Sequence, residues 1–172
     1  VFNPQGTVTA GNSSAISDGA AALLIMEKEL ALEKGFSKDR LIEIKGFSKT
    51  GVSPSVMGLA PISAVTELLS KSVPDISGEN YNLEDIELIE LNEAFSIQAL
   101  ACLDGLDLID EIDAKVNLKG GAIALGHPLG CSGARITTTL FHLMHEEEKS
   151  LGISTMCVGM GQGLATLLKK CE

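Results

Sequence analysis

Tryptophan is absent from the 172-residue chain, and aromatic residues together make up only 3% of it. A platform of stacked rings for the bases of a nucleic acid is therefore not expected. Positive charge is also scarce, because 13 lysines and arginines face 23 acidic residues and leave a formal net charge of −10. This charge argues against nucleic acid or an anionic membrane surface as the main partner.

Long apolar runs are missing as well. Runs such as residues 20–26 are far too short to cross a bilayer, and no basic start followed by an apolar stretch indicates a signal peptide. No two of the four cysteines form a C-x-x-C pair, and a chain of this size with 45% hydrophobic residues does not depend on disulfides. We therefore expect reduced, cytoplasmic surroundings and no membrane contact. The cysteines are Cys102, Cys131, Cys157 and Cys171.

Apolar periodicity along the chain predicts alternating strands and helices, which is typical of an α/β layered domain. Gly35 is expected to end the first helix. The last two strands, joined by a glycine-rich turn, are expected to pair antiparallel. Strands are predicted at residues 20–26, 40–48, 86–91, 153–158 and 164–169, and helices at 27–34, 61–71, 93–103 and 133–149.

Asn92 follows the strand predicted at residues 86–91, within the segment LNEAF. The end of a strand that precedes a helix is where α/β sheets usually place their ligands. The alternative is that Asn92 is the N-cap of the next helix, and the residue types alone favour this plainer role.

His127 lies between Gly126 and Pro128 in a glycine-rich segment, residues 120–133, that has few bulky side chains. Such a segment lets backbone or ligand approach the imidazole closely. Histidine titrates near neutral pH, so it can accept or donate a proton. The density of glycine favours a functional histidine over a structural one.

Cys157 ends an apolar strand and faces the glycine-rich turn at residues 159–163. A thiol reacts only when its pKa is lowered or a base lies beside it, and the alternative is a buried small apolar side chain. Backbone N–H groups at the neighbouring glycines are typical parts of an oxyanion hole. If Asn92, His127 and Cys157 converge, their amide, imidazole and thiol suit acyl or carbanion chemistry without a metal.

A metal site is the weakest of the hypotheses that the residues raise. His142 and His145 are three residues apart and share one face of the helix predicted at 133–149. A run of glutamates follows at residues 146–148, and a solvated helix end explains all five side chains. A zinc site would need three or four converging ligands, so we expect no metal.

Three of these segments resemble the motifs of the thiolase family, in the family's order and at its spacing. They are NEAF at residues 92–95, GGAIALGHPLGCSGAR at 120–135 and CVGMGQG at 157–163. A fourth segment, TVTAGNSSAISDGAA at 7–21, resembles the loop at the end of the family's first half. The resemblance implies a thiolase-like layered α/β domain, with a mixed sheet and helices on both faces. Residues 1–38 would be a remnant of the N-terminal half and 39–172 the C-terminal domain.

The resemblance also implies a reaction, in which two acetyl-CoA molecules condense to acetoacetyl-CoA or free CoA cleaves a 3-ketoacyl-CoA. His127 would help to activate the nucleophilic cysteine of the family and polarise a thioester oxygen. Cys157 would move the proton at the α-carbon. Asn92 would hold the water that forms one oxyanion hole with His127, and the N–H of Gly159 would contribute to the other.

Substrate contacts follow from the same resemblance. Ser14 matches a position that contacts the pantetheine arm, and Ala94 and Phe95 match positions that line the acyl pocket. Coenzyme A enters as a substrate, and no other cofactor is implied. The expected partners are acyl-CoA, the N-terminal thiolase half and, in the complete protein, further copies in a dimer or tetramer.

The sequence departs from the family in several places. The family's nucleophilic cysteine lies in the first half, and neither Cys102 nor Cys131 matches its motif, so the isolated chain is expected to be inactive. Met160 and Ala15 stand where many members have glycine. The alternative to a catalytic half is a non-catalytic binding or assembly module that keeps the fold.

The apolar segment at residues 20–26 raises a separate expectation. In the family it belongs to the sheet of the first half. Without that sheet it would expose apolar surface and an unpaired edge. We therefore expect the isolated chain to self-associate or to dock this segment differently.

Overall fold

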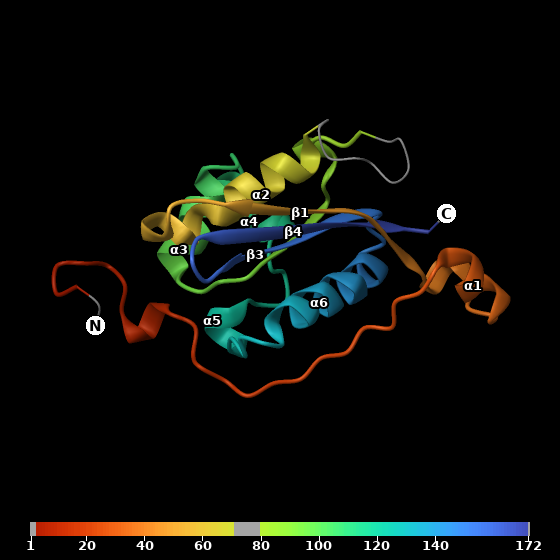
Figure 1. The fold of residues 1–172 in the computed structure, drawn as a ribbon, viewed down its shortest axis with the longest axis horizontal. Coiled ribbons are helices and arrows are strands. Elements are labelled where there is room, and N and C mark those ends of the chain that lie inside the picture. Colours follow the sequence, from red (N-terminus) through yellow and green to blue (C-terminus); the bar gives the residue numbers. More distant parts are fainter. Residues whose placement is uncertain (1–2, 71–79, 172) are drawn as a thin grey trace.

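A four-stranded mixed sheet forms the middle of the molecule in the computed structural model, which describes residues 3–70 and 80–171 (Figure 1). The strand order is β1-β4-β3-β2, in which β4 pairs antiparallel with both neighbours and β2 pairs parallel with β3. The predicted antiparallel pair at the end of the chain is therefore confirmed. The strands are β1 (Ile42–Gly51), β2 (Leu88–Leu91), β3 (Leu151–Val158) and β4 (Gln162–Lys170).

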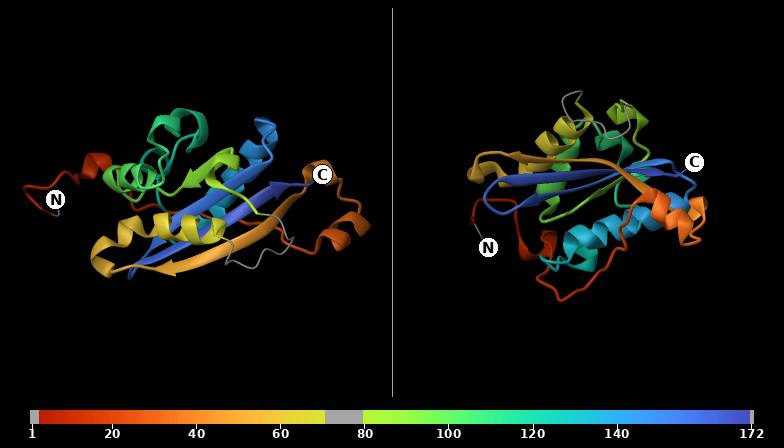
Figure 2. Two further views of the ribbon diagram at one scale, coloured as in Figure 1. Left: turned by 90° about the horizontal axis from the view of Figure 1, so that it is seen from above. Right: turned by 45° about the vertical axis from the view of Figure 1, so that its right-hand side comes forward.

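Helices cover both faces of the sheet, as Figures 1 and 2 show, and this confirms the predicted layers. Helices α2 and α3 lie on one face, and α6 crosses the other. The helices are α1 (Lys28–Glu33), α2 (Ala60–Leu69), α3 (Ser96–Asp104), α4 (Ile112–Lys115), α5 (Ala122–Leu125) and α6 (Ser132–Glu146). Short 3-10 helices occur at Ala10–Asn12, Lys38–Arg40, Pro54–Leu59, Leu83–Asp85 and Ile109–Glu111.

Two apolar clusters hold these layers together. On the α2 and α3 face, Val65 and Leu103 pack with Ile153 of the sheet. On the other face, Leu140 of α6 belongs to a second cluster with Leu88 and others. Each fully buried side chain of this kind stabilises the fold by about 1.5–3 kcal/mol. These two clusters set the distance between the helices and the sheet.

Gly152 of β3 allows α6 to come close to the sheet. A Cβ atom at this position would lie 2.8 Å from Cδ1 of Leu140. A side chain here would therefore force the buried Leu140 side chain of α6 to move.

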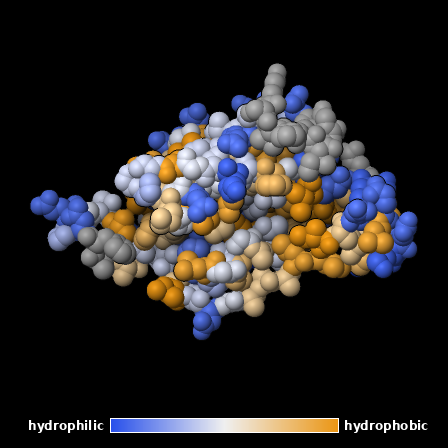
Figure 3. All heavy atoms as spheres, viewed as in Figure 1, coloured by the Kyte–Doolittle hydropathy of each residue, from blue (hydrophilic) through white to orange (hydrophobic). Residues whose placement is uncertain are grey.

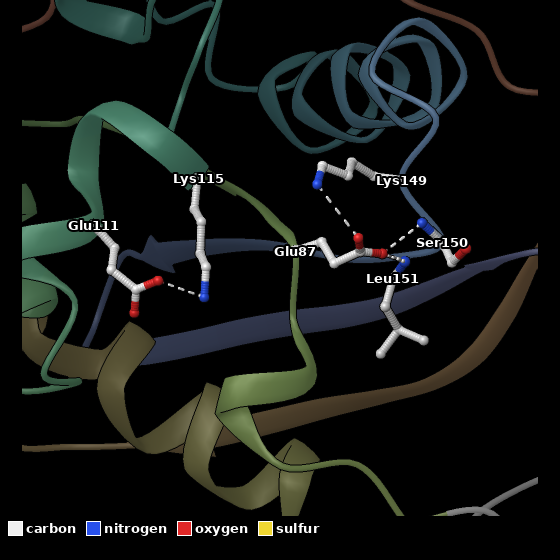
Figure 4. A network of polar contacts seen from close by, with 6 residues as sticks. All are labelled: Glu87, Glu111, Lys115, Lys149, Ser150 and Leu151. Atoms are coloured by element: carbon white, nitrogen blue, oxygen red, sulfur yellow. Dashed lines mark hydrogen bonds and ion pairs between the residues drawn. The ribbon is translucent and has the colours of Figure 1, made fainter.

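Glu87 ties the start of β3 to the segment that precedes β2 (Figure 4). Its carboxylate accepts the N–H groups of Ser150 at 2.7 Å and Leu151 at 3.2 Å, and Lys149 lies 3.5 Å away. Burial raises the pKa of Glu87, but the two N–H donors and Lys149 outweigh it and hold that pKa below its ordinary value. This contact fixes the amino ends of the two parallel strands relative to each other.

The strand predicted at residues 20–26 is wrong. This segment is extended but belongs to no strand, and it leads into α1, which Gly35 (φ 84°) ends as expected. Leu24 is 76% exposed and Ile25 is 68% exposed. A strand requires a neighbour that completes its backbone hydrogen bonds, and the described residues supply none here.

The sheet also carries an exposed apolar side chain. Ser48 of β1 bonds to the carbonyl of Ala64 in α2, so the adjacent Phe47 points to the α6 face, where it is 67% exposed. Figure 3 shows apolar atoms gathered beside the end of the molecule that carries α1. Large exposed apolar side chains gathered in this way are typical of a surface that another protein segment covers.

We expect the isolated chain to self-associate at micromolar concentration through this surface. Replacing both Leu24 and Ile25 with serine should shift the mass measured by size-exclusion chromatography with light scattering toward that of a monomer. The double variant Glu33→Ser, Lys34→Ser alters exposed residues without changing net charge and should leave the wild-type mass unchanged. A wild-type chain that stays monomeric at every concentration would contradict this expectation.

Candidate functional site

Asn92 directly follows β2 and is fully buried. Its N–H donates to the carbonyl of Thr155 in β3 at 3.0 Å, so the backbone pairing continues past the end of the strand. Its side-chain amide nitrogen lies 3.3 Å from Nε2 of His127. Helix α3 begins later, with Phe95 as its N-cap residue, so the alternative that Asn92 caps this helix is wrong.

The loop around Asn92 is held by the side chain of Asn117. Its Oδ1 accepts the N–H of Leu91 at 2.9 Å, and its Nδ2 donates to the carbonyl of Leu91 at 2.8 Å and to Glu93 at 2.9 Å. The other carboxylate oxygen of Glu93 accepts the N–H of Ile123 at 3.2 Å. A Cβ at Gly121 would lie 2.1 Å from the Glu93 carboxyl carbon, so a larger residue there would displace this carboxylate from its partners. The glycine-rich segment is thus fastened to the end of β2.

His127 follows α5 and precedes α6. Its Nδ1 lies 2.6 Å from Oγ of Ser132, the buried first residue of α6, and this hydroxyl bonds to the carbonyl of Pro128 at 3.1 Å. Gly126 before it has φ 103°, a conformation that favours glycine. Burial lowers the pKa of His127, and the charge of Arg135 lowers it further. Both causes favour the neutral imidazole, which is able to accept a proton.

The N-terminal segment joins the two loops. Both the N–H and the hydroxyl of Ser14 bond to the carbonyl of Ala94 at 3.0 Å. Phe95 forms an antiparallel bridge with the residue before Ser14. The N–H of His127 donates to the carbonyl of Ala15 at 3.0 Å. Five of the predicted site residues are thereby brought into one connected group: Ser14, Asn92, Ala94, Phe95 and His127.

Cys157 lies near the carboxyl end of β3, two residues beyond Thr155. Because β2 and β3 run parallel, Cys157 and Asn92 lie at the same edge of the sheet. In the part of the chain that the structure describes, no hydrogen bond joins Cys157 to Asn92 or His127. The thiol is buried, and burial raises the pKa of Cys157 above its ordinary value. It is therefore protonated at neutral pH.

The turn after β3 carries Gly159, which is exposed and has open space around the position of a Cβ. Met160 follows with φ 69° and is 82% exposed, so it neither fills the core nor narrows a pocket within the described residues. Gly161 has φ 85°, and a Cβ there would lie 2.3 Å from the carbonyl oxygen of Val52. The turn is therefore packed closely against Val52 at Gly161 and is exposed at Gly159.

Two charged residues at the site, Arg135 and Glu90, were not predicted from the sequence. Arg135, in the first turn of α6, places Nη2 3.4 Å from Oδ1 of Asn92. Glu90 of β2 is fully buried, and neither carboxylate oxygen has a hydrogen-bond partner among the described residues. Burial raises the pKa of Glu90 to about 7, Arg135 opposes this rise and Glu93 adds to it. Their signal in the sequence is an acid between apolar residues of a predicted strand and a lone cation in a glycine-rich segment.

A hollow of about 330 Å³ lies between the extended N-terminal segment and the loop after His127. It is lined by residues 17–21 and 128–131, and Cys131 forms part of its wall. The hollow adjoins the connected group, because His127 directly precedes one lining segment and Ala15 lies two residues before the other.

The described residues contain no group of three or more His, Cys, Asp or Glu side chains placed to hold a metal ion. His142 and His145 lie against the ring of Phe141, with centroids 5.3 Å and 4.8 Å away. No helix in the described part of the chain has the length and apolar character that crossing a bilayer requires.

Comparison with known families identifies the fold. The model of the thiolase C-terminal domain matches residues 38–170, and that of the thiolase N-terminal domain matches residues 1–29. This chain belongs to the thiolase family. It is 50% identical over 171 residues to a 3-ketoacyl-CoA thiolase of Idiomarina loihiensis, which covers 99% of this chain and 42% of the relative. A 3-ketoacyl-CoA thiolase of Vibrio vulnificus is 51% identical over 171 residues, with the same coverage.

Solved thiolase structures superpose closely on this chain. Bacillus anthracis acetyl-CoA acetyltransferase matches with a TM-score of 0.88 and 41% identity, over 98% of this chain and 40% of that structure. Human mitochondrial 3-ketoacyl-CoA thiolase matches with a TM-score of 0.83 and 37% identity, over 99% and 40%. The resemblance and the thiolase-like α/β fold are thus confirmed. The chain spans about two fifths of the length of these relatives.

Glu90 should make the stability of the thiolase chain depend on pH. The pKa of Glu90 in the folded chain lies above the ordinary value of 4.5. Its contribution to the stability of the folded state is therefore fully present below about pH 4.5 and is lost as the pH rises through about 7. Glu90→Gln should therefore be more stable than wild type in urea unfolding at about pH 8.5, by up to about 3 kcal/mol. The difference should shrink toward pH 5, where the wild-type carboxyl is protonated.

The exposed Glu67→Gln exchange is the matched control and should give only a small difference in stability. A Glu90→Gln variant that is less stable than wild type at about pH 8.5 would show that Glu90 is paired when ionised.

Proposed function

We propose that this chain provides the acid–base part of a thiolase active site. The proposed reaction is the condensation of two acetyl-CoA molecules to acetoacetyl-CoA, or its reverse, the cleavage of a 3-ketoacyl-CoA by free CoA. The observation that carries the proposal is the contact of 3.3 Å between the Asn92 amide and Nε2 of His127, at the carboxyl edge of the parallel strand pair.

His127 is proposed as the base that takes the proton of the nucleophilic cysteine, which in the family belongs to the other half. The lowered pKa of His127 supports this role, because a neutral imidazole at rest has a free lone pair. With a water held by Asn92, the protonated imidazole would then stabilise the negative charge that develops on a thioester oxygen.

Cys157 is proposed as the group that moves the proton at the α-carbon. Its raised pKa keeps the thiol protonated at rest. In cleavage, the carbon–carbon bond breaks and the departing enolate carbon takes the proton from Cys157, which leaves a thiolate. In condensation, the thiolate removes that proton again. The exposed N–H of Gly159, two residues on, is proposed as a donor to the second thioester oxygen.

Substrate contacts are proposed for the residues that join the two loops. Ser14 donates its hydroxyl proton to the carbonyl of Ala94, so the oxygen lone pairs remain able to accept an N–H of the pantetheine arm. Ala94 and Phe95 are half-buried beside Asn92 and are proposed to line the acyl pocket. Coenzyme A would take part as substrate, and the proposed steps use no metal or other cofactor.

The proposed partners are the N-terminal half of a thiolase and further copies of the assembled protein. The exposed apolar side chains of Leu24, Ile25 and Phe47 favour such docking. The same surface would equally serve a non-catalytic module that keeps the thiolase fold. Turnover separates the two, because only the catalytic half depends on His127 and Cys157.

The test measures cleavage of acetoacetyl-CoA by CoA. The chain alone should show no turnover, and the chain co-assembled with an N-terminal thiolase half should restore it. His127→Ala and Cys157→Ser should each lower kcat of the assembly by roughly 10²–10⁴-fold, the usual contribution of a positioned acid or base. The exposed Glu67→Gln exchange should leave the rate unchanged.

Assembly is checked by light scattering before each assay. An assembled complex without turnover would contradict the catalytic proposal and favour the non-catalytic module. Turnover by the purified chain alone would contradict the division of the site between two halves.

A further inference from the structure

Arg135 contacts the side chain of Asn92. It rises from the first turn of α6, and its Nη2 lies 3.4 Å from Oδ1 of Asn92. The Nε and Nη1 atoms are buried and have no hydrogen-bond partner among the described residues. The one polar contact that the structure gives this guanidinium is therefore directed at the amide that faces His127.

The chemistry of the groups decides which way this amide points. A guanidinium has only donors, so the carbonyl oxygen of Asn92 must face Arg135. The NH₂ group must then face Nε2 of His127, at 3.3 Å. With the amide reversed, two donors would oppose each other at Arg135.

The same reasoning continues through the imidazole. An amide NH₂ can only donate, so Nε2 of His127 must carry a lone pair. The ring proton then sits on Nδ1 and donates to Oγ of Ser132 at 2.6 Å. That hydroxyl donates in turn to the carbonyl of Pro128 at 3.1 Å. In each contact from Nη2 of Arg135 to the carbonyl of Pro128, a donor thus meets an acceptor.

We propose that Arg135 is a positioning residue that, through the amide of Asn92, fixes His127 in the tautomer with Nδ1 protonated and Nε2 free to take a proton. The tautomer stands independently of the proposed function. Its catalytic consequence rests on that function, because Nε2 is the atom that would take the proton of the nucleophile.

The charges around the pair agree with this arrangement. Arg135 on α6 is the cation that acts on His127, and it opposes the protonation of the imidazole. The anionic groups are Glu90 on β2 and Glu93 in the loop after it. Glu93 is engaged by Asn117 and Ile123, and the charge of Arg135 opposes the rise that burial causes in the pKa of Glu90. Arg135 is thereby kept close to Asn92 without a competing ion pair to Glu93.

The direct test is the ¹⁵N NMR spectrum of the full chain labelled at histidine. In the wild type, His127 should show a protonated Nδ1 and an unprotonated Nε2 at about pH 7.5, at which imidazoles are largely neutral. A wild-type spectrum in which Nε2 carries the proton would overturn the inference without any variant.

Arg135→Met supplies the second measurement. Without the guanidinium, the amide of Asn92 is free to turn its oxygen toward His127, so the Nε2-protonated form should appear and the pKa of His127 should rise. Arg135→Lys keeps a cation and a donor and should restore the wild-type tautomer in part. Arg40→Met, at an exposed position, should leave the His127 signals unchanged.

In the assembled enzyme, Arg135→Met should lower kcat by roughly 10- to 100-fold with little change in KM, a share of what a positioned base contributes. The limb of the pH–rate profile that reports the base should move to higher pH. A folded Arg135→Met variant with wild-type tautomer, His127 pKa and kcat would reduce Arg135 to a packing role and overturn the inference.

The two proposals fail in different ways. An assembly that lacks turnover while His127 shows the expected tautomer would refute the proposed function and leave the positioning role intact. An active assembly in which Nε2 of resting His127 is protonated would refute the positioning role alone.

Discussion

The parallel pairing of β2 with β3 is the constraint on which the site depends. Leu91 lies opposite Thr155, and the bond from the Asn92 N–H to the Thr155 carbonyl carries the pairing one residue beyond β2. This one register places a buried amide and a buried thiol at the same edge of the sheet. A shift by one residue would turn Asn92 to the opposite face, away from α6 and His127.

Buried polarity gives this edge its chemical character. Glu90, Asn92 and Ser132 are all fully buried, yet the last two lie within one network of hydrogen bonds, whereas the carboxylate of Glu90 has none among the described residues. A buried group without a partner costs the fold stability. The structure therefore carries a destabilising charge directly under its candidate site, a combination that is common where pKa values are tuned for function.

Much of the fold and part of the site follow from local patterns in the sequence. The helices and the last strands have clear periodicity, and Asn92 and His127 stand beside glycines and strand ends, so their meeting could be anticipated. Residues 20–26 have the composition of a strand, but pairing is a property of two segments and no local pattern reveals a missing neighbour. Arg135 and Ser132 owe their roles to the turn at Pro128, which folds α6 back on His127. Residue types alone do not predict the direction in which α6 leaves this turn.

The N-terminal segment has a consequence for where this chain can be divided. It runs extended along the molecule beside α5 and α6, and its backbone at Ala15 accepts the N–H of His127 (Figure 1). A cut near residue 38, where the sheet begins, would remove the backbone acceptor of the imidazole loop together with both bonds to Ala94. Residues 13–15 are thus held through hydrogen bonds to the two loops that carry Asn92 and His127, and a division of the chain upstream of Ser13 would leave these contacts in place.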